Sequence, residues 1–263
     1  MSLDRIPFRE VLEHLAELSD AAGVEMILVG ATARDIALVA ENQDAALRAT
    51  NDVDVAVAVQ NAEAFMQLTS SLTPARRGVA HKFTVAGVEV DIVPFGGIES
   101  LERTITWPDG AVMNTLGFAE SARSALRIKL GGERTVLVAS LAAQAALKIF
   151  AWADRNDRTE RDAVDLRTLI DAYSAADRFD NLYAEGNQGT LAHYDYDVRH
   201  AGAHLLGADV RDQLGGLVAA RCAQTIGTDD SRAFERLSRA MRADVAENAN
   251  LLVALRSGLA SQG

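Results

Sequence analysis

Apolar side chains recur along the first half of the chain in two patterns, one with the spacing of a helix and one with that of a strand. Between Pro7 and Gly23, apolar residues lie at helical spacing, which predicts an amphipathic helix. The apolar run that follows ends at Gly30 and predicts a buried strand. The expected elements are a helix over 7–23, a strand over 25–30, a helix over 32–42, a strand over 52–59 and a helix over 61–72 with Asn61 as its N-cap.

Two further β-rich segments each contain a short turn with glycine. In residues 81–97 the turn is at Ala86 and Gly87, and in residues 126–140 it is at Gly131 and Gly132. Both patterns predict hairpins.

The pattern changes near residue 139. From residue 140 onward the chain is alanine-rich with helical period, and no linker rich in proline, glycine or serine separates the two parts. We therefore expect an α+β fold, with a mixed sheet flanked by helices over residues 1–139 and an all-helical domain over residues 140–263.

The composition is that of an ordinary globular protein. Hydrophobic residues make up 49% of the 263 residues, and no apolar run reaches the roughly 18 residues that a transmembrane helix needs. The N-terminal sequence lacks the pattern of a signal peptide, and the single cysteine, Cys222, fits a reducing compartment. We therefore expect a cytoplasmic protein without a membrane partner, in which Cys222 is a core residue. The net charge of −11 argues against a large basic surface for nucleic acid, although a local basic groove can exist on an acidic protein.

Three aspartates are candidates for a metal site. Asp52 and Asp54 occupy alternate positions of the strand expected over 52–59, so their side chains lie on one face. Asp91 lies on the second arm of the hairpin expected over 81–97, and if that arm pairs beside the first strand, the three carboxylates converge. Their oxygens suit Mg²⁺. The alternative is a solvated strand face, because pairs of acids one residue apart are frequent in an acidic chain.

The turn at Gly30 adds a candidate phosphate site. Backbone N–H groups at the start of a helix can hold a phosphate, and glycine lets the phosphate approach closely. Alone, such a turn is an ordinary connection between a strand and a helix. The order of elements is more informative, since it runs strand, glycine turn, helix, strand with two aspartates, and hairpin with a third.

This order, with these residues, resembles the nucleotidyltransferase superfamily that includes DNA polymerase β, and more closely the AbiEii/AbiGii-type nucleotidyltransferases of toxin–antitoxin and phage-defence systems. The resemblance covers about residues 24–173 and implies a nucleotidyltransferase-like fold. It implies that Gly30 contacts the triphosphate, and that Asp52 and Asp54 hold the metal. Asp91 would be the third metal ligand and a candidate base.

The second half contributes a further motif in "ALKIFAWADRNDRTERDAVDL". It is similar to the family's lysine on one helix followed by KDxxDL on the next, with Arg161 where lysine is usual. The resemblance implies that Lys148 touches nucleotide phosphates, with Asp162 and Asp165 in the second element. We expect Asp165 to position Lys148. The structural alternative for Lys148 is a side chain that extends along the edge of an amphipathic helix.

The chain departs from the family's pattern at the turn, where Ala31 replaces the usual serine. Thr32 is the nearest hydroxyl. Arg34 is either a phosphate contact or a turn-stabilising partner of Asp35, and Arg48 is a further phosphate candidate. His193, His200 and His204 lack an HExxH pattern, so we expect surface or core histidines rather than a metal site.

The resemblance implies an EC 2.7.7-type nucleotidyltransferase that uses Mg²⁺ to move a nucleoside monophosphate from an NTP to an acceptor hydroxyl. It favours RNA, such as a tRNA end, as the acceptor, and implies a toxin with a cognate antitoxin. Two alternatives remain open. Because of Ala31, the protein could be a nucleotide-binding or interaction module with weakened chemistry, or the acceptor could be a protein or a small molecule such as an aminoglycoside.

Overall fold

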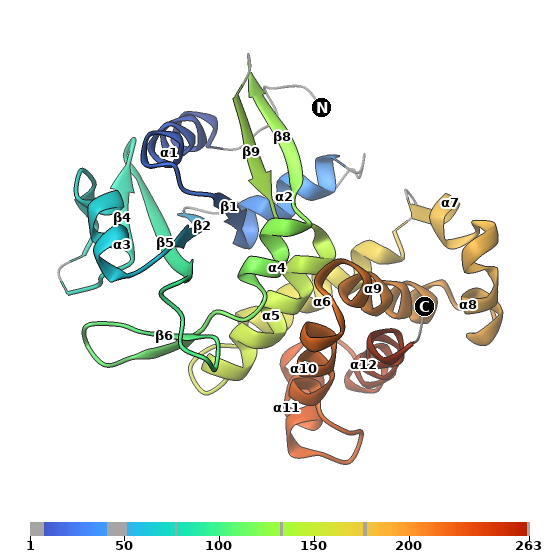
Figure 1. The fold of residues 1–263 in the computed structure, drawn as a ribbon. Coiled ribbons are helices and arrows are strands. Elements are labelled where there is room, and N and C mark those ends of the chain that lie inside the picture. Colours follow the sequence, from blue (N-terminus) through green and yellow to red (C-terminus); the bar gives the residue numbers. More distant parts are fainter. Residues whose placement is uncertain (1–7, 41–51, 77, 132–133, 176–177, 262–263) are drawn as a thin grey trace. The chain divides into compact units, whose positions relative to one another are not determined.

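The computed structural model of the chain describes residues 8–40, 52–76, 78–131, 134–175 and 178–261. The chain divides into two units, Met1–Ser140 and Leu141–Gly263. The first is built on a β-sheet and the second consists of helices (Figure 1). This agrees with the α+β fold expected from the sequence.

The sheet of the first unit is mixed and has seven strands in the order β3-β4-β5-β2-β1-β9-β8. β2 runs parallel to β5 and β1 runs parallel to β9, whereas the other neighbours are antiparallel. The strands are β1 (Met26–Val29), β2 (Asp52–Val59), β3 (Thr73–Pro74), β4 (Lys82–Val85), β5 (Val88–Gly96), β8 (Leu126–Gly131) and β9 (Arg134–Val138). A separate two-stranded sheet consists of β6 (Thr104–Thr106) and β7 (Val112–Asn114).

Among the described residues of this unit, four helices accompany the sheet: α1 (Arg9–Ala22), α2 (Gly30–Ala40), α3 (Ala62–Thr69) and α4 (Phe118–Arg123). The predicted cap of α3 is present, because Ala64 N–H donates to Asn61 Oδ1 at 2.9 Å. Helix α2 begins at Gly30, two residues before its predicted start at residue 32. Both predicted hairpins are formed, by β4 with β5 and by β8 with β9.

The two faces of β2 have different environments. Val53, Val55, Val57 and Val59 are buried in one hydrophobic core with side chains of α1 and α3. Because side chains alternate along a strand, Asp52 and Asp54 lie on the opposite face. The alternation of valine and aspartate therefore separates the core from the candidate site.

The second unit is a set of packed helices. They are α5 (Leu141–Arg155), α6 (Arg161–Tyr173), α7 (Phe179–Leu182), η3 (Glu185–Asn187), α8 (Gln188–His193), α9 (Val198–Leu214), α10 (Gly216–Ile226), α11 (Arg232–Ala240) and α12 (Val245–Ala260). Helices α9 and α12 lie side by side (Figure 1), and they meet where a Cβ on Gly258 would stand 1.9 Å from the carbonyl oxygen of His204. Cys222 is fully buried in α10, as expected for a core residue. No described helix is long and apolar enough to span a membrane.

Candidate functional site

Four acidic strand positions lie in register on one face of the sheet of the first unit. β2 and β5 are parallel, with Asp54 opposite Asp91 and Asp52 opposite Glu89. Partners in adjacent strands point to the same face. The expected pairing of the hairpin arm beside the aspartate strand is therefore confirmed, and we call Asp52, Asp54, Asp91 and Glu89 the acid face.

The turn at Gly30 adjoins this face. A Cβ built on Gly30 would lie 2.1 Å from Oδ2 of Asp54, and the backbone has φ of +72°. Only glycine satisfies both conditions, since other residues add a Cβ and disfavour positive φ. Helix α2 starts at this residue, so the Asp54 carboxylate lies near the N-terminal end of a helix. The structure thus brings together the turn and one of the two aspartates that the sequence pattern associates with it.

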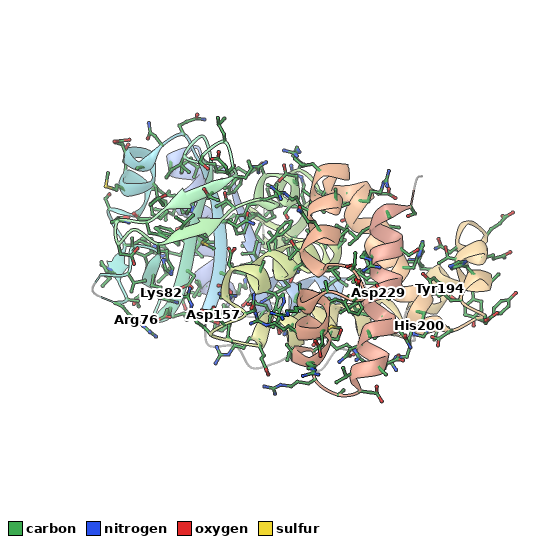
Figure 2. The ribbon with its side chains drawn as sticks, turned by 90° about the horizontal axis from the view of Figure 1, so that it is seen from below. Arg76, Lys82, Asp157, Tyr194, His200 and Asp229 are labelled. Carbon is green, nitrogen blue, oxygen red and sulfur yellow. The ribbon has the colours of Figure 1, made fainter. Side chains whose placement is uncertain are left out.

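Lys82 is a member of the site that the sequence reasoning missed. Its Nζ donates to both carboxylate oxygens of Asp91, at 2.6 and 2.8 Å, and to Glu89 at 2.9 Å. Burial opposes the charge of Lys82, but the hydrogen bonds to Asp91 and Glu89 outweigh it and raise the pKa of Lys82. Figure 2 shows Lys82 with Arg76, which extends the same charge cluster through an ion pair to Glu89 at 3.5 Å.

The hairpin register contains the signal for Lys82. Counting outward from the turn at Ala86 and Gly87 pairs Val85 with Val88 and Lys82 with Asp91. A two-residue turn fixes that pairing. The predicted hairpin alone was therefore sufficient to place a lysine beside the third aspartate.

The donors of the acid face have the chemistry that Mg²⁺ prefers, namely carboxylate oxygens. Within the described residues, however, no three Asp, Glu, His or Cys side chains are arranged so that they could hold a metal ion. The expected three-carboxylate site is thus not assembled, and Asp91 instead faces Lys82. Mg²⁺ commonly needs only one or two carboxylates when phosphate oxygens and water complete its coordination. Asp52 and Asp54 would satisfy that requirement.

The remaining phosphate-binding candidates of the first unit differ in burial and in their hydrogen-bond partners. Ala31 is partly exposed at the start of α2, whereas Thr32 is buried and its hydroxyl donates to the carbonyl of Asp52 at 3.3 Å. Arg34 is 4% exposed and forms an ion pair with Asp35 at 2.7 Å, which matches the turn-stabilising alternative. Arg48 lies outside the described residues.

In the second unit, Lys148 of α5 pairs with two carboxylates of α6. Its Nζ lies 2.7 Å from Asp165 and 3.2 Å from Asp162. The expected contact between Asp165 and Lys148 is therefore present. Asp162 is fully buried and also accepts hydrogen bonds from Arg155 at 2.6 and 2.8 Å. Burial raises the pKa of this carboxyl, but the hydrogen bond from Arg155 and the charge of Lys148 dominate and lower it.

The histidines surround an aromatic ring. Tyr194 Oη lies 3.1 Å from Nδ1 of His204, and the ring of His193 stands edge-on to Tyr194 with centroids 4.7 Å apart. Burial lowers the pKa of His204. Figure 2 shows Tyr194 and His200 in this region. Over the described ranges no group of three His, Cys, Asp or Glu side chains that could hold a metal ion includes them.

A comparison with protein families matches residues 14–236 to the family described as nucleotidyl transferase AbiEii toxin, type IV TA system. No curated protein sequence matches the chain. Among solved structures, the antibiotic-resistance factor ANT(2'')-Ia shares 15% identity with a TM-score of 0.39, and the similarity covers 73% of this chain and 98% of that one. The assignment follows from the family match, which spans more than four fifths of the 263 residues. The chain belongs to the AbiEii nucleotidyltransferase toxin family.

Proposed function

We propose that this protein uses Mg²⁺ to transfer a nucleoside monophosphate from an NTP to an acceptor hydroxyl, in an EC 2.7.7-type reaction. The observation that supports this most directly is the Gly30 turn against Asp54, a residue in register with Asp91. A glycine turn that opens a helix offers N–H groups to phosphates, and the adjoining carboxylates suit the cation that accompanies them.

The proposed reaction makes one bond and breaks one bond. The acceptor oxygen bonds to the α-phosphorus, while the bond from that phosphorus to the oxygen bridging the β-phosphate breaks, and pyrophosphate leaves. The hydroxyl proton passes to a carboxylate of the acid face, for which Asp91 is the candidate base. Mg²⁺ held by Asp52 and Asp54 would neutralise charge on the phosphates. Lys82 would orient Asp91, because it binds both carboxylate oxygens.

Lys148 is the proposed phosphate contact of the second half. Its side chain is 18% exposed, and its pairing with Asp165 at 2.7 Å restricts its orientation. A lysine charge held in a defined place can stabilise negative charge on a transferred or leaving phosphate. This role would make Asp165 a positioning residue.

Membership of the AbiEii family is the basis for proposing an acceptor, a protein partner and a location in the cell. We propose RNA, such as a tRNA end, as the acceptor, a cognate antitoxin as a protein partner and the cytoplasm as the location. The family description, a type IV toxin, supports the antitoxin.

The second candidate is a protein that binds NTP with little or no transfer. It is favoured by the turn itself, where Ala31 has no hydroxyl and that of Thr32 is directed to the Asp52 carbonyl. The turn then offers phosphates backbone N–H groups only, which removes a contact available to family members with serine.

Incubation of the purified protein with Mg²⁺, total RNA and each α-labelled NTP separates these functions. Label on an RNA band, absent with Asp52→Ala/Asp54→Ala, is the expected result and would identify the base. Label on protein or on an added aminoglycoside would instead change the acceptor. Calorimetric binding of Mg-NTP with no label on any acceptor would refute transfer and support the binding module.

A further inference from the structure

The second unit contains a polar pocket of about 400 Å³. It is lined by the connection between α5 and α6, Asn156 to Arg161, together with Arg242. Figure 2 shows Asp157 of this connection well separated from Tyr194 and His200. The lining has no aliphatic or aromatic side chain, which makes it unsuited to an apolar ligand.

Long-range contacts hold the parts of this pocket together. Arg236 Nη2 donates to the carbonyl of Asn156 at 3.4 Å, which joins α11 to the α5–α6 connection. Arg242 follows α11 with φ of +60°, and its carbonyl accepts from the amide of Asn248, a fully buried side chain of α12. The pocket is thus a defined feature of the unit rather than a chance approach of two loops.

The charge of this region is opposite to that of the whole protein. Residues 155–162 and 232–242 carry seven arginines against four carboxylates, one of which, Asp162, is paired with Arg155 at 2.6 Å, whereas the chain has a net charge of −11. On α11, Phe234, Leu237 and Ala240 face the core, so Arg232, Arg236 and Arg239 lie on the exposed side. The same side carries Glu235, which forms an ion pair with Arg239 at 2.7 Å, so arginine outnumbers carboxylate three to one on the solvated side of this amphipathic helix.

The arginines that line the pocket form only long ion pairs or none within the described residues. Arg158 lies 3.6 Å from Asp157 and Arg242 lies 3.7 Å from Glu160, and the two arginine side chains are 76% and 71% exposed. Within the described ranges the guanidinium of Arg161 has no ion pair. Exposed ion pairs at such distances contribute little, so these arginines are free to bind an external anion. Arginine binds phosphate well, since its planar fork donates two parallel hydrogen bonds.

We propose that Arg158, Arg161 and Arg242, with the exposed arginines of α11, form a surface that binds the phosphate backbone of single-stranded RNA. The extent of the surface favours a polymer. Within α11, from Arg232 to Arg239, a helical rise of 1.5 Å per residue gives about 10 Å, which is longer than one phosphate group. The choice of RNA rests on the proposed function, but the surface itself belongs to the second unit alone and involves none of the acid face.

The test is fluorescence anisotropy of a labelled single-stranded RNA of 20 nucleotides, without NTP. Arg158→Gln/Arg242→Gln should bind about tenfold more weakly than the wild type, and the slope of log affinity against log salt should fall by about 1.4, or 0.7 for each lost phosphate contact. The control, Arg123→Gln/Arg221→Gln, removes the same charge from exposed positions elsewhere and should change neither quantity. Melting temperatures establish that all variants fold.

Equal weakening in both double variants, or unchanged binding in Arg158→Gln/Arg242→Gln, would overturn the proposal. The proposal would also be overturned if Arg158→Gln/Arg242→Gln bound RNA as tightly as the wild type but no longer bound phosphatidylserine vesicles. The same measurement on Asp54→Asn keeps the two proposals apart. This variant should retain RNA binding even though it loses transfer, so failure of one proposal does not imply failure of the other.

Discussion

The replacement Gly30→Ala tests the contact on which the candidate site depends. The added Cβ would lie 2.1 Å from Oδ2 of Asp54, whereas nonbonded heavy atoms normally lie about 3.5 Å apart. Asp54 must therefore shift by more than about 1 Å. A displacement of that size in a reacting group costs on the order of a hundredfold in rate. We expect transfer of the α-labelled nucleotide to fall by about that factor.

The change also strains the backbone, and Gly23→Ala is a control for that strain. Gly23 has φ of +64° at the end of α1, and a Cβ added there would have no atom within 4 Å. Both variants should lose about 1–2 kcal/mol for an alanine at positive φ. That corresponds to a fall in Tm of about 3–6 °C by calorimetry. Only Gly30→Ala also displaces a carboxylate.

The two variants together therefore separate strain from displacement. Gly23→Ala should keep the wild-type rate at a temperature well below its Tm, while Gly30→Ala should lose it. Equal rates in the two variants, or a Gly30→Ala enzyme with more than half of the wild-type rate, would refute the proposed role of the turn.

Three further changes test other parts of the structure. Lys82→Met should reduce nucleotidyl transfer about tenfold, because the ion pair that orients Asp91 is lost, whereas the control Lys129→Met should leave the rate unchanged. Equal transfer rates in the two variants would show that Lys82 has no role in the site. Asp162→Asn should lower the free energy of unfolding at pH 7 by about 2 kcal/mol, because Arg155 loses its charged hydrogen-bond partner while Lys148 keeps its ion pair with Asp165. The pKa of the Asp162 carboxyl is lowered in the folded state, so the stabilisation that it provides is present above about pH 4 and is lost as the pH falls further. Urea titrations below about pH 4 should therefore show a smaller loss of stability for the variant than for the wild type. Gly258→Ala should lower the Tm by several degrees, because the added Cβ would clash with the backbone of α9. Gly216→Ala is the control, since a Cβ added there would have no atom within 4 Å. An unchanged Tm for both variants would contradict the close crossing of α9 and α12.

Local patterns in the sequence determine much of the first unit. The strand 52–59 and the turn at Ala86 and Gly87 are both visible as alternation and turn chemistry. The same turn implies the pair of Lys82 with Asp91. These features follow from the sequence because strand register depends on neighbouring residues and on the length of the turn.

Other features depend on contacts between distant residues. One example is the hydrogen bond from Arg236 to the carbonyl of Asn156, 80 residues away in the chain, which joins α11 to the connection between α5 and α6. Spacing along one helix gives no indication of such a contact. The direction of the Thr32 hydroxyl is a similar case, since its acceptor, the Asp52 carbonyl, lies on another element. Burial of Arg34 with Asp35 likewise follows from the packing of α2 rather than from its sequence pattern.

The most direct test of the central proposal compares two labels of the same NTP. With Mg²⁺ and RNA, label in the α-phosphate should appear on the acceptor and label in the γ-phosphate should not, because pyrophosphate leaves. Asp54→Asn should abolish transfer, while Asp20→Asn, an exposed change on α1, should not. Transfer of the γ-label, or undiminished transfer of the α-label by Asp54→Asn, would contradict nucleotidyl transfer at the acid face.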